Sequence, residues 1–296
     1  MCGIAGMFGR PDIDVVHAMN HYQIHRGPDG QDAWADDRIA LGHTRLAIVD
    51  RAGGDQPLFG PNGEVLIANG EIYNHPLLRT QNTTYAWTSN VDSEAIMALH
   101  SQAKNHSKHH HLTPKDHAKW VAQLDGMYAF RLWDPAAGQL ILARDPLGIK
   151  PMVRTVVEGS LMFASEAKAL RAHEGHTPAF DELALVARLA WEYPLDGTTL
   201  LKDVHHIRPG TVEVWTLDNE APTLVGVADV ERQVLNPTTG WDPQTQSATL
   251  LESFVESVSQ RLMGEVPMGI VLSGGLDSAL VAAVAHEAAE RAGQPV

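Results

Sequence analysis

Met1-Cys2-Gly3-Ile4-Ala5-Gly6 opens the sequence, and every expectation for the fold begins from this stretch. Methionine is removed efficiently when the second residue is small, so we expect Cys2 to become the first residue of the mature chain. Its thiol and its α-amino group would then have pKa values near ~8.5 and ~8. Because these values match, the amine can accept the thiol proton, and Cys2 is predicted to be a nucleophile that carries its own base. The alternative is a small buried residue in a strand.

The composition indicates a folded, acidic chain. Of its 296 residues, 44% are hydrophobic and 20% are charged, which suffices for a buried core and more than one domain. The formal net charge of −14 repels phosphate backbones and argues against nucleic-acid binding. Cys2 is the only cysteine, which rules out an intrachain disulfide and fits a reducing cytosol. No apolar run approaches the ~18–20 residues of a membrane span, and no signal peptide is visible, so we predict a soluble cytoplasmic protein.

Strand signals outnumber helix signals up to about residue 217, and many predicted strands follow one another directly. This order favours antiparallel sheets with helices packed outside them, an α+β fold, over a parallel βαβ series. Residues 134–138, with Pro135 and Gly138, predict a turn between two of the strands. Strands are predicted at residues 3–9, 40–50, 65–73, 128–134, 139–145, 152–157, 161–164 and 211–217, and helices at 13–25, 93–102, 118–124 and 181–191.

The pattern changes near residue 220. Residues 219–247 hold prolines, Thr and Gln with little periodicity, and we interpret them as a linker. Apolar residues then recur at helical spacing over 250–262, and Met268–Leu272 is typical of a parallel strand buried on both faces. A glycine-rich loop and a helix over 279–292 complete the beginning of a doubly wound α/β domain. The predicted divisions are 1–218, the linker 219–247, and an incomplete second domain over 248–296.

Blocks of sequence in a fixed order, from residue 2 to residue 278, resemble the class II, N-terminal-nucleophile glutamine amidotransferases of the asparagine synthetase branch. The blocks are 2–6, 25–30, 42–50, 69–75, 125–130, 143–151, 163–170 and 273–278. The resemblance implies an αββα sandwich of antiparallel sheets, followed by the start of an ATP-pyrophosphatase domain. It also implies that glutamine is hydrolysed through a Cys2 thioester, and that the ammonia serves the ATP-dependent amidation of aspartate to asparagine.

The same resemblance assigns roles around the nucleophile. Arg45 would pair with the α-carboxylate of glutamine, where a guanidinium fork fits two oxygens. Glu71 and Asp92 would receive the α-ammonium group, although the spacing around Asp92 is slightly loose for the family. The side-chain amide of Asn69 and the backbone N–H of Gly70 would form the oxyanion hole. The residues expected to line the site beside Arg45 are Leu46, Ala47, Ile48 and Val49. Taken singly, each of these residues is better interpreted as a surface charge or a turn residue. Together with Cys2 and in this order, they favour the functional interpretation.

A second motif lies at residues 273–278, between the predicted strand and the last helix. Its glycines allow close approach of a phosphate, and a helix N-terminus supplies N–H groups. It resembles the pyrophosphate loop of ATP pyrophosphatases, which implies ATP and Mg²⁺ as cofactors of a complete synthetase, with no cofactor for glutamine hydrolysis. Leu272 would lie near the nucleotide and Asp277 near Mg²⁺ or the phosphates. The residues assigned to ATP are Leu272, Ser273, Gly274, Gly275, Asp277 and Ser278; no metal-ligating residue is assigned.

Several questions stay open at this level. The residues after the second motif cannot hold an aspartate site, so we expect no asparagine synthesis from this chain alone. The expected partner is a second copy of the chain, in a homodimer, or a separate synthetase chain. Two alternatives to asparagine formation are a related amidotransferase that amidates another acid and an inactive binding or regulatory module. Arg26 and the block 144–151 are expected to be architectural. The histidine-rich stretch 100–117 is expected to be a solvated loop and not a metal site.

Overall fold

Residues 3–8 form a fully buried strand that pairs with a strand on each side. The computed structural model describes residues 1–107, 111–193, 197–231, 240 and 242–292. The chain divides into two units, a larger one of Met1–Ala47 with Ala52–Glu231, and a smaller one of Ile48–Arg51 with Arg232–Val296.

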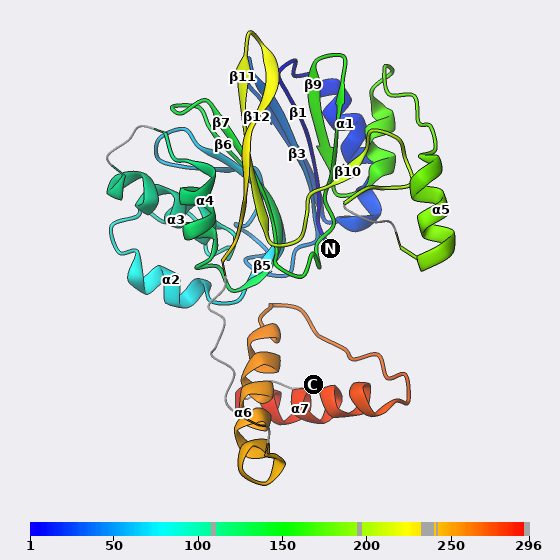
Figure 1. The fold of residues 1–296 in the computed structure, drawn as a ribbon. Coiled ribbons are helices and arrows are strands. Elements are labelled where there is room, and N and C mark those ends of the chain that lie inside the picture. The colour runs from blue at the N-terminus through cyan, green and yellow to red at the C-terminus, as the bar shows by residue number, and fades with distance from the viewer. Residues whose placement is uncertain (108–110, 194–196, 232–239, 241, 293–296) are drawn as a thin grey trace. The chain divides into compact units, whose positions relative to one another are not determined.

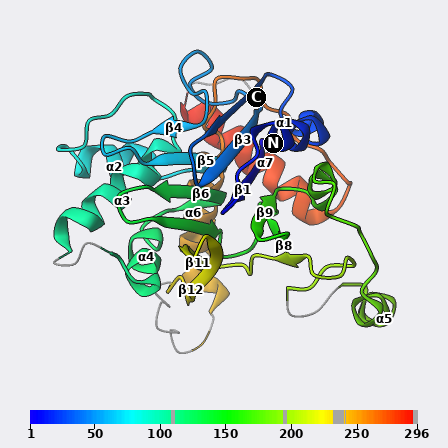
Figure 2. The same ribbon diagram turned by 90° about the horizontal axis from the view of Figure 1, so that it is seen from above.

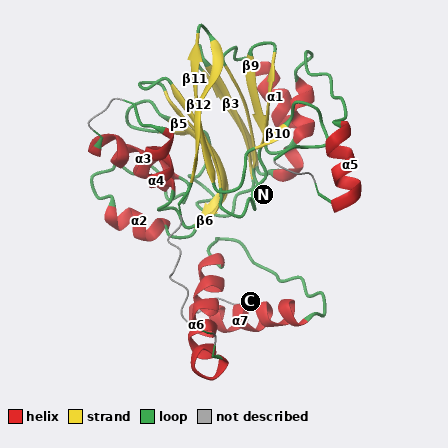
Figure 3. Ribbon diagram, in the orientation of Figure 1, coloured by secondary structure: helices red, strands yellow, loops and turns green. Residues whose placement is uncertain are grey.

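The larger unit contains two antiparallel six-stranded sheets (Figures 1 and 3). The first sheet comprises β1 (Gly3–Phe8), β2 (Gly30–Ala35), β3 (Ile39–Arg45), β8 (Val153–Val157), β9 (Ser160–Ala164) and β10 (His205–His206). The second comprises β4 (Leu58–Phe59), β5 (Val65–Ile72), β6 (Gly126–Asp134), β7 (Gln139–Arg144), β11 (Thr211–Asp218) and β12 (Ala221–Asp229). Their strand orders are β10-β8-β9-β1-β3-β2 and β12-β11-β7-β6-β5-β4. The turn predicted between β6 and β7 is confirmed, with Gly138 at a φ of 62°.

Helices cover the outer faces of both sheets. The helical segments are α1 (Ile13–Tyr22), η1 (Ile24–Arg26), α2 (His75–Gln81), α3 (Glu94–His106), α4 (Pro114–Val121), η2 (Ala167–Ala172) and α5 (Glu182–Trp191). α1 and η2 lie on the side of the first sheet, whereas α2, α3 and α4 lie on the side of the second (Figure 2). The predicted α+β fold, an αββα sandwich of antiparallel sheets, is confirmed.

The core follows from the alternation of side chains along the strands. In β1, Ile4 and Phe8 point between the sheets, where the ring of Phe8 lies 5.5 Å from that of Trp133. The intervening Ala5 and Met7 point the other way, toward α1. Because successive side chains of a strand face opposite sides, a strand that is buried on both faces must be apolar throughout. The first strand is therefore fixed from both sides directly after Cys2.

Part of the predicted linker 219–247 belongs to the larger unit. Residues 221–229 form β12, which pairs with β11 along its length. The sequence hid this strand because most of its side chains are exposed and its apolar residues do not alternate with polar ones. The linker also overlaps α6 (Pro243–Arg261), whose N-cap Asp242 accepts from Gln244 N.

The smaller unit does not contain the buried strand that we predicted at Met268–Leu272. This segment has no regular secondary structure, and Val271 is 93% exposed. A β-strand needs a hydrogen-bonded neighbour, and residues 242–292 provide none. The helices on either side, α6 and α7 (Leu276–Ala292), agree with the expected helical spacing.

The histidine-rich stretch is also different from the solvated loop that we expected. α3 continues to His106, and α4 begins directly after its N-cap Thr113. His100 and His117 are buried, and their rings stack with centroids 5.8 Å apart. Helical periodicity places these two side chains in the core, which a reading of composition alone could not show. Residues 108–110 lie outside the described part of the chain.

Candidate active site

Cys2 directly precedes β1, and two residues, Leu46 and Arg26, contact it. The N–H of Leu46 points at the Cys2 sulfur across 3.4 Å, and the sulfur lies 3.8 Å from the carbonyl oxygen of the same residue. On the other side, Nε of Arg26 donates to the Cys2 carbonyl oxygen at 3.0 Å. A Cβ atom at Gly3 would lie 2.5 Å from Thr44 Oγ1, so only glycine lets β1 and β3 meet this closely. Cys2 is thus positioned by the backbone of Leu46, the side chain of Arg26 and the close approach of β1 to β3.

Asn69 and Gly70 lie side by side on β5, where they pair with β6. Asn69 is 1% exposed, and its side-chain Nδ2 has no hydrogen-bond partner among the described residues. A buried donor without a partner costs about 1–3 kcal/mol, so such groups are usually reserved for a function. A Cβ atom at Gly70 would lie 2.3 Å from the Met127 carbonyl oxygen, which makes glycine necessary here. This pair offers a donor of the kind that an oxyanion hole requires.

A lysine from the block 144–151, which was expected to be architectural, interacts with the chain's first residues. Lys150 is 4% exposed, and its ammonium group interacts electrostatically with the Cys2 thiol, the terminal amine and the Glu71 carboxylate. Burial lowers the pKa of Lys150, while Glu71 and Cys2 raise it. Burial raises the pKa of the Cys2 thiol, whereas the bond from Leu46, the terminal amine and Lys150 act in the opposite direction. Lys150 therefore favours the thiolate.

The loop that carries Lys150 is shaped by two charged residues of the same block. The Asp145 carboxylate accepts from the backbone N–H groups of Leu147, Ile149 and Lys150 at 2.9–3.2 Å. The guanidinium group of Arg144 donates to three backbone carbonyl oxygens, those of Gly148, Lys150 and Ile207. The expectation that the block is architectural fits Arg144 and Asp145. The expectation does not account for Lys150, since no local sequence pattern shows that this side chain interacts with the first residues of the chain.

Two carboxylates, those of Asp92 and Glu71, lie close enough to interact electrostatically. Asp92 is buried, and its Oδ2 accepts from Ile72 N at 2.6 Å, which ties it to the end of β5. Burial, together with the charge of Glu71, raises the pKa of Asp92 to about 6, against the lowering effect of the bond from Ile72. Burial also raises the pKa of Glu71, while Lys150 and the terminal amine lower it. Two adjacent carboxylates of this kind can receive a substrate ammonium group, which would relieve their mutual repulsion.

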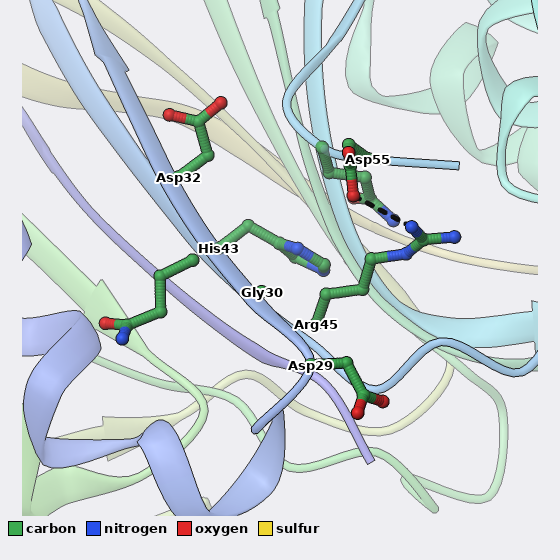
Figure 4. A pocket seen from close by; sticks show the side chains of 8 residues that line it. Asp29, Gly30, Asp32, His43, Arg45 and Asp55 are labelled. Carbon is green, nitrogen blue, oxygen red and sulfur yellow. Dashed lines mark hydrogen bonds and ion pairs between the residues drawn. The ribbon is translucent and has the colours of Figure 1, made fainter. Parts of the chain in front are cut away.

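Arg45 ends β3 directly before Leu46, and it lines a cavity of about 180 Å³ (Figure 4). Its Nη1 lies 2.8 Å from Asp55 Oδ1. The other residues of the lining are Asp29, Gly30, Gln31, Asp32, His43 and Gln56. Asp29 accepts from the N–H of Ala47 at 2.8 Å, and so fixes the backbone just beyond Arg45. Ile48 and Val49, which we expected to line the site as well, group with the smaller unit.

Comparison with known proteins agrees with this geometry. A family model described as "Glutamine amidotransferase domain" matches residues 1–223, and a model described as "Asparagine synthase" matches residues 249–295. The chain belongs to the glutamine amidotransferase family. The outcome confirms the resemblance drawn from Cys2 and the blocks that follow it.

Similar curated proteins are glutamine-hydrolysing asparagine synthetases. Asparagine synthetase 1 of Bacillus subtilis is 29% identical over 97% of this chain and 44% of its own length. Asparagine synthetase B of Escherichia coli is 32% identical over 98% of this chain and 46% of its own. Our amidotransferase chain thus spans less than half the length of these relatives. Among solved structures, the glutamine phosphoribosylpyrophosphate amidotransferase of Bacillus subtilis matches with a TM-score of 0.54 at 19% identity, covering 99% of this chain and 65% of that one, which supports the fold alone.

The second motif of the amidotransferase chain lies in the smaller unit, where it opens α7 as expected. The hydroxyl oxygens of Ser273 and Ser278 lie 3.0 Å apart, and Gly274 has a φ of 83°. Gly275 N donates to Ser273 Oγ at 3.4 Å, and Asp277 lies in the first turn of the helix. Leu272, directly before the loop, is exposed. Hydroxyl groups and N–H groups at the start of a helix suit a phosphate, so the residues present fit the assigned ligand.

Two features are absent from the part of the chain that the structure describes. No helix of these residues is both long and apolar enough to cross a bilayer. No group of three or more His, Cys, Asp or Glu residues in the same part of the chain is arranged to hold a metal ion.

Proposed function

We propose that this chain hydrolyses glutamine through Cys2 and supplies the ammonia to an ATP-dependent amidation of aspartate to asparagine. Two observations carry the proposal in a chain of the glutamine amidotransferase family: the free thiol of Cys2, and the buried amide donor Asn69 Nδ2, which has no hydrogen-bond partner among the described residues. The names of the curated relatives support the second half of the proposal.

The nucleophile requires removal of Met1, which is 55% exposed and so accessible to an aminopeptidase. The freed α-amine of Cys2 takes the thiol proton, and the thiolate attacks the carboxamide carbon of glutamine. The oxygen of the resulting tetrahedral intermediate accepts from Asn69 Nδ2 and the N–H of Gly70. The protonated amine then gives its proton to the departing nitrogen, which leaves as ammonia. Water then hydrolyses the thioester through a second tetrahedral intermediate, which the same two donors stabilise, and glutamate is released.

Recognition of the amino-acid end of glutamine falls to three charged residues. Arg45 offers two parallel donors to the α-carboxylate. Glu71 and Asp92 accept from the α-ammonium group. The electrostatic interaction of Asp92 with the Cys2 thiol, and of Glu71 with Asp92, supports this assignment. A substrate that lacks either charged group would lose these contacts, so we expect simple aliphatic amides to be poor substrates.

The synthetase reaction is assigned to the complete enzyme. Ser273, Gly274, Gly275 and Ser278 would hold the phosphates of ATP, with Asp277 near Mg²⁺ and Leu272 near the nucleotide. ATP supplies the activation of the aspartate carboxyl group when it is bound. Aspartate as the acid, a cytoplasmic location, and a homodimer or a separate synthetase chain as partner all belong to this proposal.

The test is release of ammonia and glutamate from glutamine by the purified chain, with mass spectrometry to establish that Met1 is absent. The matched control is Cys2→Ala, which keeps the strand and removes the thiol. Release that is lost in the variant supports the proposal. A folded chain without Met1 that releases no ammonia contradicts it.

A further inference from the structure

The guanidinium group of Arg45, which we assign to the α-carboxylate of glutamine, already forms an ion pair with Asp55. The side chain of Arg45 is 9% exposed, whereas that of Asp55 is 78% exposed, and their closest atoms lie 2.8 Å apart. Figure 4 shows the two side chains directed toward each other at the edge of the cavity. One partner is thus fixed in the protein, and the other can move into solvent.

The position of Asp55 depends on the residue that follows it. Gln56 is buried, and its Oε1 accepts from the backbone N–H of Ala68 on β5 at 2.6 Å. This bond ties the loop to the second sheet one residue away from Asp55. The backbone at Asp55 is therefore held near Arg45, while the exposed carboxylate can still turn toward solvent.

A side-chain carboxylate and the α-carboxylate of an amino acid are the same chemical group. Both present two oxygens to a guanidinium fork, and both seek the same donors. When glutamine brings its α-carboxylate to Arg45, the carboxylate of Asp55 must give up at least the Nη1 contact or remain as a like charge beside the substrate. In either case the substrate binds less tightly than it would to Arg45 alone.

We propose that Asp55 is an affinity-determining residue of the glutamine site, which competes with the α-carboxylate of glutamine for Arg45. This inference rests on the proposed role of Arg45 in glutamine hydrolysis. Asp55 lies outside the group of Cys2, Asn69 and Gly70, so its effect falls on substrate binding and leaves the chemical step unchanged.

The test is steady-state glutamine hydrolysis by Asp55→Asn, which keeps the shape of the side chain and removes its charge. Since exposed ion pairs are weak, we expect KM to fall about two- to fivefold, with kcat unchanged. The matched control is Asp32→Asn. Asp32 lines the same cavity, but its carboxylate accepts from the neighbouring Ala33 N and is not paired with Arg45. Its variant should change KM less than Asp55→Asn does.

A second substrate separates competition from a general change of charge. Glutaminamide, in which the α-carboxylate is an uncharged amide, does not compete with Asp55 for the guanidinium group, so Asp55→Asn should leave its KM unchanged. A KM for glutamine that rises or stays constant in Asp55→Asn overturns the inference, as does an equal decrease for both substrates. If Arg45→Gln leaves the KM of an active enzyme unchanged, the role of Arg45 is wrong; absence of activity in the unmodified chain refutes the proposed function itself.

Discussion

Asn69→Leu should make the protein more stable and nearly inactive. Leucine has the same number of side-chain heavy atoms as asparagine, so the variant removes the amide without opening a large space. The Nδ2 group is buried and unpartnered among the described residues, and such a donor costs about 1–3 kcal/mol. After allowance for repacking, we expect a gain of about 1 kcal/mol, or roughly 2–4 °C in Tm for a unit of this size. Loss of one oxyanion-hole donor should reduce kcat by about 10²–10³-fold.

The matched control is Asn74→Leu, five residues along the chain. Both polar atoms of Asn74 are in use, since Nδ2 donates to Gln123 O at 2.8 Å and Oδ1 accepts from Asp125 N at 3.0 Å. Its replacement should lower stability by about 1–2 kcal/mol and leave kcat close to that of the unmodified chain.

Thermal unfolding and glutamine hydrolysis, measured on the same preparations, give both quantities for each variant. The reasoning fails if Asn69→Leu destabilises the chain as much as Asn74→Leu does, because Nδ2 would then have a partner in the resting protein. It also fails if kcat falls less than about tenfold, since the intermediate would be stabilised elsewhere.

Three further predictions concern charged groups. Lys150→Met should slow alkylation of Cys2 by iodoacetamide at pH 7 by about three- to tenfold, because the thiolate loses a nearby cation, and Lys150→Arg should restore the rate; equal rates in all three proteins would refute this. Asp92, with its pKa near 6, should bind the α-ammonium of glutamine only when ionised, so KM should rise as pH falls through 6, and Asp92→Asn should remove that dependence. Folding lowers the pKa of His100 to about 3 and that of His117 to about 4, chiefly through burial, so the unfolded chain binds more protons below pH 6.5. The free energy of unfolding should therefore fall as pH decreases from 6.5 toward 4, and urea titrations of His100→Leu should show a shallower fall.

Local signals in the sequence predicted much of the larger unit. The strand directly after Cys2 and the turn that ends at Gly138 were both predicted from neighbouring residues alone. The structure confirms the strand and the turn. β12 was missed because it is an exposed edge strand, whose side chains obey no alternation. The apolar run ending at Leu272 predicts a strand because its composition favours burial. A strand also needs hydrogen bonds to a neighbouring strand, which composition does not show.

The parts of the site that escaped prediction are contacts between distant residues. Nothing near Lys150 in the sequence shows that it faces Cys2, and nothing near Asp55 shows that it meets Arg45. His100 and His117 were misjudged for the same reason, since their burial is a property of packed helices. Motif order can indicate which residues carry the chemistry, but the charges that adjust it are set by the tertiary fold.

The ladder that joins β1 to β3 begins at Gly3, and the clamp from Arg26 holds the carbonyl group of Cys2, not its nitrogen. These contacts therefore form whether or not the peptide bond between Met1 and Cys2 has been cleaved. An N-terminal affinity tag would leave every one of these contacts in place, yet it would turn the amine that the proposed mechanism requires into an amide with no basicity. Such a product would purify as a well-folded protein and fail every activity assay, so a tag for this chain belongs at the other end.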